Sequence, residues 1–176
     1  MKNILIIGGT RGIGKAIVNE VITRNKVICL SRNNTDYDHN NYEFKSFDAL
    51  VDDYPDIDKL DCLIYCPGSI NLKPISSLSL DDFRNDFELN VIGAVRAVKK
   101  YIPLLKKSES ASILLFSTVA TKLGMPYHAS VSVAKSGIDG LVKTLGSELA
   151  PKIRINAIAP TITNTELASK ILRNDK

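Results

Sequence analysis

The sequence predicts a three-layer α/β fold, in which helices cover both faces of a doubly wound parallel sheet. Three observations support this prediction. Short apolar runs of strand length alternate with segments in which apolar residues recur at helical spacing. A glycine-rich turn joins the first apolar run to the first helical segment. The 176 residues, 44% of them hydrophobic, are enough for one core, so we expect a single domain over residues 1–176.

Six segments have the composition of buried strands. They are Asn3–Ile7, Lys26–Leu30, Tyr42–Phe47, Cys62–Cys66, Ser112–Ser117 and Arg154–Ala159. Connections between parallel strands are right-handed, so the carboxyl ends of these strands should share one edge of the sheet and form a ligand crevice there.

The segments between the strands predict helices. Three long helices are expected at Gly12–Thr23, Asp81–Leu105 and Ala129–Leu149, and a short one around Ala49–Asp53. Ser79 is a suitable cap for the second long helix, and Lys106 and Lys107 complement the dipole at its end.

Composition excludes two classes of partner. The net charge of +4 comes from 23 basic and 19 acidic residues spread along the chain, which gives no basic stripe for nucleic acid. Apolar runs such as Ile113–Phe116 are far too short to span a bilayer, and the first residues lead into a strand instead of a signal peptide. We therefore expect a cytoplasmic protein that binds neither nucleic acid nor membranes.

No metal site is predicted. The three cysteines, Cys29, Cys62 and Cys66, lie in or beside apolar runs and are expected to be buried thiols, because their number and spacing suit neither a disulfide framework nor a zinc site. Five aspartates also gather in one loop, without a histidine or cysteine at ligand spacing. They are Asp52, Asp53, Asp56, Asp58 and Asp61. A solvated acidic surface is the simpler interpretation.

The glycine-rich turn has the features of a phosphate cradle. It consists of Gly8, Gly9, Thr10, Arg11, Gly12, Ile13 and Gly14. Glycines allow an unusual φ and a close approach of the backbone to a ligand, and the amino end of the next helix offers free amides to a pyrophosphate. An ordinary turn is the alternative, but the strand before it and the helix after it supply the context of a dinucleotide site.

The residues after the second strand indicate which dinucleotide binds. An acidic side chain at this place would accept hydrogen bonds from a ribose diol, but the chain has Ser31-Arg32-Asn33 instead. The guanidinium of Arg32 suits a phosphate, and Arg11 adds a second cation. The pair favours NADP(H) over NAD(H), unless both arginines are merely solvated surface charges.

On these motifs, nearly the whole chain resembles the short-chain dehydrogenase/reductase family. The glycine turn resembles the family's Gly-x-x-x-Gly-x-Gly, with Ile7 where threonine is usual. The resemblance implies a Rossmann fold, a nicotinamide cofactor and hydride transfer to or from a small carbonyl or alcohol substrate.

The resemblance also assigns cofactor-binding residues at the other strand ends. Asp48 corresponds to the residue that binds the adenine amino group. Tyr65-Cys66-Pro67-Gly68 stands where the family usually has Asn-Asn-Ala-Gly, so Cys66, Pro67 and Gly68 are expected beside the cofactor. The segment Asn156–Pro160 leads to the nicotinamide, with Thr161 in place of the usual glycine. Pro160, Thr163 and Thr165 are expected near the carboxamide and the phosphates.

The expected catalytic residues depart from the family pattern at one position. Asn90 matches the helix asparagine that holds a water of the proton relay, Thr118 stands at the family's serine, and Lys135 matches the lysine of Tyr-x-x-x-Lys. The tyrosine position, however, is Val131. We expect Thr118 to polarise a carbonyl oxygen and Lys135 to anchor the ribose, but valine can neither donate nor accept a proton.

Three interpretations of Val131 remain open. Another side chain could supply the proton, and His128 is the best candidate because imidazole exchanges protons near neutral pH. Pro126 favours a helix that begins there, with Tyr127 and His128 in its first turn, although His128 could equally make a structural hydrogen bond. Alternatively, water or the substrate carries the proton. In the third interpretation, the domain binds NADP(H) without turnover, as a sensor or interaction protein.

Two expectations concern assembly. The segments Asp81–Leu105 and Ala129–Leu149 resemble the helices that form dimer contacts in the family, which implies a homodimer or homotetramer. The resemblance ends soon after Leu167, so the family's closing lid helices and last strand are expected to be absent from these 176 residues, and the sequence could be a fragment.

Overall fold

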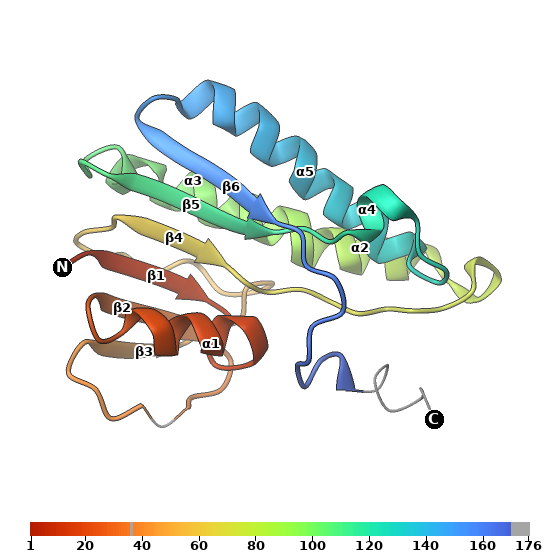
Figure 1. Cartoon of the computed structure of the whole chain (residues 1–176), viewed down its shortest axis with the longest axis horizontal. Coiled ribbons are helices and arrows are strands. Elements are labelled where there is room, and N and C mark those ends of the chain that lie inside the picture. Colours follow the sequence, from red (N-terminus) through yellow and green to blue (C-terminus); the bar gives the residue numbers. More distant parts are fainter. Residues whose placement is uncertain (36, 170–176) are drawn as a thin grey trace.

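The computed structural model describes residues 1–35 and 37–169, and it confirms the predicted fold class (Figure 1). All strand pairs are parallel, in the order β3-β2-β1-β4-β5-β6. The strands are β1 (Asn3–Ile7), β2 (Lys26–Ser31), β3 (Tyr42–Ser46), β4 (Cys62–Tyr65), β5 (Ala111–Phe116) and β6 (Ile153–Ile158). Their bounds agree with the predicted ones to within one residue.

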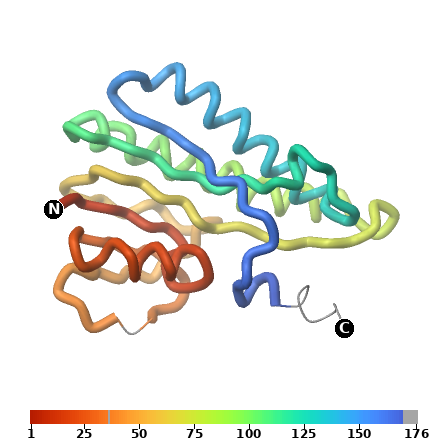
Figure 2. Tube along the Cα trace, in the orientation of Figure 1, coloured from red at the N-terminus to blue at the C-terminus, as the bar shows by residue number. Residues whose placement is uncertain are grey.

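Helices cover both faces of this sheet, as the trace in Figure 2 shows. They are α1 (Gly12–Val21), α2 (Leu80–Phe87), α3 (Gly93–Leu105), α4 (Ala120–Leu123) and α5 (Ala129–Leu149), with a 3-10 turn η1 (Ile75–Ser77) and a π-helical turn η2 (Glu88–Ile92). The side chains of β1 alternate between the two faces. Ile4 and Ile6 join the core beneath α1, whereas Leu5 and Ile7 join the larger core with residues of α3 and α5.

The predicted helix Asp81–Leu105 is interrupted by a π-helical turn. Its start is as expected, because the Ser79 hydroxyl caps α2 and accepts a hydrogen bond from the Asp82 amide at 3.1 Å. The helix then passes through η2 before it continues as α3. A π turn contains one more residue than an α turn, and it places Asn90 on the buried side.

The short helix predicted around Ala49–Asp53 was wrong, because this segment forms turns. The Arg96 guanidinium, which projects from α3, donates hydrogen bonds to the carbonyl oxygens of Ala49, Leu50 and Asp52 at 2.8–3.2 Å. An arginine side chain from another helix thus satisfies carbonyl groups that a local helix would have paired with its own amides. The sequence spacing alone could not predict this long-range contact.

Tyr65 ties the end of β4 to the π turn. Its hydroxyl donates a 2.7 Å hydrogen bond to the carbonyl oxygen of Leu89, and its ring is buried. Gly93 leaves the space for this hydroxyl, since a Cβ atom at Gly93 would overlap the Tyr65 Oη atom. The tyrosine that stands in place of the family's first asparagine is therefore accommodated by a glycine on α3.

We predict that Gly93→Ala lowers the free energy of unfolding by about 1–3 kcal/mol, because the methyl group overpacks against the Tyr65 hydroxyl. Urea unfolding of the variant measures this change. Gly140→Ala is the matched control, because a Cβ at Gly140 meets no atom of the described residues within 4 Å. Its gain in helix propensity should stabilise the protein by about 0.5–1 kcal/mol. Equal effects of the two substitutions would contradict the account, as would a failure of Tyr65→Phe to relieve the cost of Gly93→Ala.

Candidate cofactor and active site

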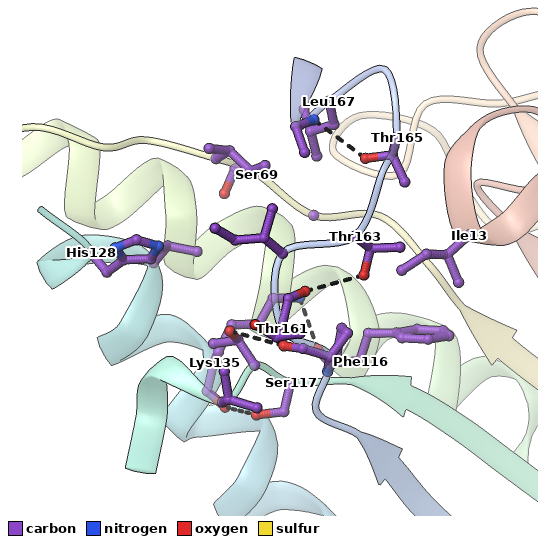
Figure 3. Close-up of a pocket in the computed structure, with 18 of the residues that line it drawn as sticks. Ile13, Ser69, Phe116, Ser117, His128, Lys135, Thr161, Thr163, Thr165 and Leu167 are labelled. Atoms are coloured by element: carbon purple, nitrogen blue, oxygen red, sulfur yellow. Dashed lines mark hydrogen bonds between the residues drawn. The ribbon is translucent and has the colours of Figure 1, made fainter. Parts of the chain in front are cut away.

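Two cavities adjoin at the carboxyl ends of the strands. The first, here called the Lys135 cavity, has a volume of about 190 Å³ and is lined by segments that follow β4, β5 and β6 and by the start of α5 (Figure 3). The second, the Arg32 cavity, has a volume of about 150 Å³ and lies at the ends of β1, β2, β3 and β4. Gly68 lines both cavities, so together they form one extended cleft.

The glycine turn lies beside this cleft and fits a phosphate cradle. Gly8 has a positive φ of 77°, and a Cβ atom at Gly14 would overlap the carbonyl oxygen of Gly8. The first amide to bond within α1 is that of Lys15, which donates to Arg11 O at 3.1 Å. The amides of Gly12, Ile13 and Gly14 precede it and are thus left for an anion.

Other side chains of the turn have different environments. Thr10 is buried, and its hydroxyl lies 2.7 Å from the hydroxyl of Ser31, a hydrogen bond that fastens the turn to the end of β2. Arg11 is exposed, and its Nε atom lies 3.7 Å from a carboxylate oxygen of Glu166, which is also exposed. Such a pair is weak, so Arg11 can exchange Glu166 for another anion.

The Arg32 cavity contains the residues that the sequence predicted for the adenosine half. Ser31, Arg32 and Asp48 line it, together with Gly8 of the glycine turn and Pro67. The Arg32 side chain is exposed. One carboxylate oxygen of Asp48 accepts a 2.9 Å hydrogen bond from the Leu50 amide, which fixes the position of that side chain.

Lys135 is the buried cation of the other cavity. Its ammonium group donates a 2.8 Å hydrogen bond to the carbonyl oxygen of Phe116, at the end of β5. Burial lowers the pKa of Lys135 to about 8, although the charges of Cys66 and Asp86 act in the opposite direction. The ammonium is held inside the protein wall and is fixed in position before any ligand binds.

Asn90 lies directly behind Gly68 and does not line the cavity. Its amide nitrogen donates hydrogen bonds to Asp86 O at 2.7 Å and to the Ser69 hydroxyl at 2.9 Å. Its Oδ1 atom has no hydrogen-bond partner among residues 1–35 and 37–169. A Cβ atom on Gly68 would lie 3.4 Å from both Asn90 Oδ1 and Lys135 Nζ. The orphaned amide oxygen and the ammonium therefore face the same point.

The hydroxyls after β5 differ in their access to the cavity. Thr118 is partly exposed, and its Oγ1 atom accepts a hydrogen bond from the Ala120 amide at 3.3 Å. Within the described part of the chain, its own hydroxyl reaches only Pro160 O, at 3.5 Å, so a substrate oxygen can compete for that proton. Ser117 is buried, and its hydroxyl lies 3.5 Å from Lys135 O.

The start of α5 corrects part of the sequence prediction. The helix begins at Ala129 as expected, but Tyr127 lies outside its first turn, with a φ of +66° and a side chain that is 60% exposed. Tyr127 is therefore not on the Val131 face of the helix. His128 is the N-cap residue and lines the cavity, at the end opposite Ile13 in Figure 3.

One nitrogen of His128 is already engaged. Its Nδ1 atom lies 2.7 Å from the carbonyl oxygen of Pro126, and a carbonyl can only accept, so this nitrogen carries a proton. The Nε2 atom remains available for proton exchange. Val131 presents only methyl groups to the same cavity and is buried.

The segment after β6 closes the side of the cleft. Pro160, Thr163 and Thr165 line the Lys135 cavity, and the Thr163 hydroxyl donates to Thr161 O at 3.1 Å. Cys66 also lines the cavity, where burial raises the pKa of its thiol to about 12. This thiol is not a nucleophile at neutral pH.

Several lining residues were not predicted from the sequence. Most are apolar residues in irregular segments, namely Ile70, Leu72, Met125, Ile162 and Leu167. Two are serines, Ser117 and Ser69, and Ser69 follows Gly68 directly. Its partner Asp86 is four residues before Asn90, a spacing that places both on one helix face and could have been noticed.

The described residues contain no helix that is both long and apolar enough to cross a membrane. Within the same ranges, no group of three or more His, Cys, Asp or Glu side chains has an arrangement that could hold a metal ion.

The parallel sheet and the cleft at its carboxyl edge define a Rossmann-type nucleotide-binding protein. A family model described as short chain dehydrogenase matches residues 2–176, and the chain belongs to this family.

Curated relatives and solved structures are similar over almost the whole chain. A 3-oxoacyl-[acyl-carrier-protein] reductase of Synechocystis is 27% identical over 95% of this chain and 76% of its own length. A tropinone reductase homolog of Datura stramonium is 30% identical over 93% of this chain and 69% of its own length. The structure of ElxO with NADP bound has a TM-score of 0.84 at 26% identity, and covers 100% of this chain and 80% of ElxO.

We predict that Lys135→Met stabilises the protein at neutral pH. The pKa of Lys135 is lowered from 10.5 to about 8 in the folded state, so below about pH 8 the buried charge destabilises the fold. This cost disappears as the pH rises from about 8 to about 10.5, because the unfolded state binds more protons in that interval.

The variant should exceed the wild type by about 1–3 kcal/mol in free energy of unfolding at pH 7, and the difference should shrink by pH 10. Urea unfolding at both pH values measures it. Lys99→Met, at an exposed lysine of α3, is the control, and it should change the free energy of unfolding at pH 7 by less than about 0.5 kcal/mol. A destabilised Lys135→Met at pH 7 would refute the cost assigned to burial.

Proposed function

We propose that this protein is an NADP(H)-dependent oxidoreductase that transfers hydride between the nicotinamide and a small carbonyl or alcohol substrate. The observation that carries the proposal is the extended cleft, in which a glycine turn with free helix amides lies beside two cavities that share Gly68. Its reductase relatives and the NADP bound in ElxO support the same chemistry.

The cofactor would supply the hydride, and the residues of the cleft would hold it in an extended form. The amides of Gly12, Ile13 and Gly14 would bind the pyrophosphate, and Asp48 the adenine amino group. Arg32, with Arg11, would bind the ribose phosphate. Cys66, Pro160, Thr163 and Thr165 would border the nicotinamide half, and Pro67 would border the adenosine half.

The reacting end would lie in the Lys135 cavity. Lys135 would anchor the ribose and add positive charge where the substrate oxygen becomes negative. The Thr118 hydroxyl would polarise the carbonyl, since its present bond to Pro160 O is long. Asn90 would fix a water behind Gly68 through its unpaired amide oxygen. His128 is one candidate for the proton donor, through its Nε2 atom, when both ring nitrogens carry a proton.

A second candidate function is binding of NADP(H) without turnover, as a sensor or interaction protein. One observation favours it: Val131 fills the wall of the cavity with methyl groups at the position four residues before Lys135.

Assembly and location are further proposals from the sequence. We propose that the chain forms a homodimer or homotetramer through α2, α3 and α5. Two apolar residues of these helices, Leu80 and Val133, are 73% and 58% exposed and would be buried by such a contact. A cytoplasmic location is proposed as well.

Hydride transfer tests the main proposal. NADPH that carries deuterium at one face of C4 should transfer it with single-face selectivity to at least one member of a panel of ketones and aldehydes, as measured by mass spectrometry of the alcohol. Tight NADPH binding without any transfer would instead support the binding protein.

The Arg32→Ala variant should bind NADPH about 10–100-fold more weakly, because a charge-assisted hydrogen bond of about 1.5–3 kcal/mol is lost. Its affinity for NADH should change little, since NADH lacks the ribose phosphate. Fluorescence titration of the apoprotein measures both affinities. Arg24→Ala, at another exposed arginine, serves as the control. Equal losses for NADH and NADPH would show that Arg32 does not read the phosphate.

A further inference from the structure

We infer that Ser69 and Asp86 form a proton relay that serves the Lys135 cavity in place of a tyrosine. The inference rests on the proposed oxidoreductase function and names a route by which the substrate oxygen exchanges its proton.

Ser69 connects the cavity to a buried carboxyl group. It follows Gly68 on the segment after β4 and lines the Lys135 cavity (Figure 3). Its hydroxyl donates a 2.6 Å hydrogen bond to Asp86 Oδ1 and accepts one of 2.9 Å from Asn90 Nδ2. Because the Asn90 amide nitrogen occupies one lone pair and the proton points to Asp86, the other lone pair of Ser69 Oγ remains for a substrate hydroxyl.

Asp86 lacks the partners that usually compensate a buried carboxylate. The residue is 3% exposed, and Oδ2 has no hydrogen-bond partner within the described part of the chain. None of the ion pairs found among those residues includes Asp86. A buried carboxylate with one bonded oxygen is costly. Such a cost is commonly retained where the group has a chemical task.

The Asp86 carboxyl group lies close enough to Lys135 for the two charges to interact. Lys135 Nζ and Asn90 Oδ1 face the same point beside Gly68, and the charge of Asp86 raises the pKa of Lys135, against the larger effect of burial. Asn90 holds Ser69 and Asp86 in position relative to each other, because its amide nitrogen donates hydrogen bonds to both Ser69 Oγ and Asp86 O. The π turn holds Asn90 on the buried side, so the relay depends on that turn.

The relay balances in both directions. During alcohol oxidation, the substrate O–H bond breaks and its proton goes to Ser69 Oγ, while the proton of Ser69 moves to Asp86 Oδ1. The carbon–hydrogen bond breaks at the same centre, and its electron pair leaves with the hydride to oxidised nicotinamide. The products are a carbonyl compound, reduced cofactor and a neutral Asp86 carboxyl group. Carbonyl reduction reverses each step, and Asp86 then regains its proton from solvent through Ser69 in the open cavity.

The test compares relay variants with matched surface variants. Ser69→Ala and Asp86→Asn remove one relay group each, and Asp86→Asn keeps an acceptor for the Ser69 hydroxyl. Ser77→Ala in η1 and Asp81→Asn in α2 change the same residue types at exposed positions. Three quantities are measured for all four variants and for the wild type. They are the NADPH affinity by fluorescence, the rate of single-turnover hydride transfer, and the infrared difference spectrum of the NADP⁺ complex with and without an alcohol substrate.

Each relay variant should transfer hydride about 100-fold more slowly or worse, the range typical of lost general acid–base catalysis, with NADPH affinity unchanged. Ser69→Thr should recover much of the rate. The wild type should show a carboxylic acid C=O band once the bound alcohol is oxidised by NADP⁺, and Asp86→Asn should abolish it. The surface variants should match the wild type.

Different failures have different meanings. Wild-type hydride transfer with relay variants within about threefold of its rate would overturn the relay and leave the oxidoreductase intact. A slow Asp86→Asn variant with no carboxylic acid band in the wild type would reduce Asp86 to a structural role and also overturn the relay. NADPH binding without any wild-type hydride transfer would overturn both the relay and the oxidoreductase proposal.

Discussion

Every strand of the described sheet runs in the same direction, and the order of strands reverses between β1 and β4. This arrangement brings all carboxyl ends to one edge, and the connections from β1 and β4 leave on opposite sides of the reversal point. The glycine turn after β1 and the Gly68 segment after β4 therefore border a common crevice. Everything proposed for the function depends on this arrangement, because it brings residues 8–14, 68–69 and 135 to one cleft.

Within the crevice, the polar groups form a layer that is fixed without a ligand. The Lys135 ammonium bonds to the end of β5, the Asn90 amide bonds to α2 and Ser69, and Ser69 bonds to Asp86. Burying the Lys135 charge lowers the stability of the fold, and the lowered pKa of Lys135 has the same cause. The same burial gives the layer fixed positions. The methyl groups of Val131 in the cavity wall cannot transfer a proton. Hydride transfer in this cavity would therefore need one of the neighbouring polar groups to carry the proton.

Much of this architecture could be predicted from the sequence because local patterns determine it. Apolar runs and helical spacing placed the strands within one residue, and Ser79 was identified as a helix cap. The errors have long-range causes. Arg96 satisfies the carbonyls of a segment predicted to be helical, the π turn lies within a continuous helical pattern, and Tyr127 leaves the helix through a positive φ. In the candidate site, the residues assigned from motifs lie in or beside one cleft, whereas Ser69 and Asp86 were missed because their hydrogen bond joins a loop to a helix residue 17 positions later.

A crystal structure with NADP⁺ bound tests the central claim most directly, that one cleft holds the dinucleotide across both cavities. We expect the pyrophosphate on the amides of Gly12–Gly14 and the ribose phosphate beside Arg32. The nicotinamide should lie in the Lys135 cavity, with its C4 atom on the side of Ser69 Oγ. A cofactor bound with its nicotinamide outside the Lys135 cavity, or with its pyrophosphate away from the glycine turn, would contradict it.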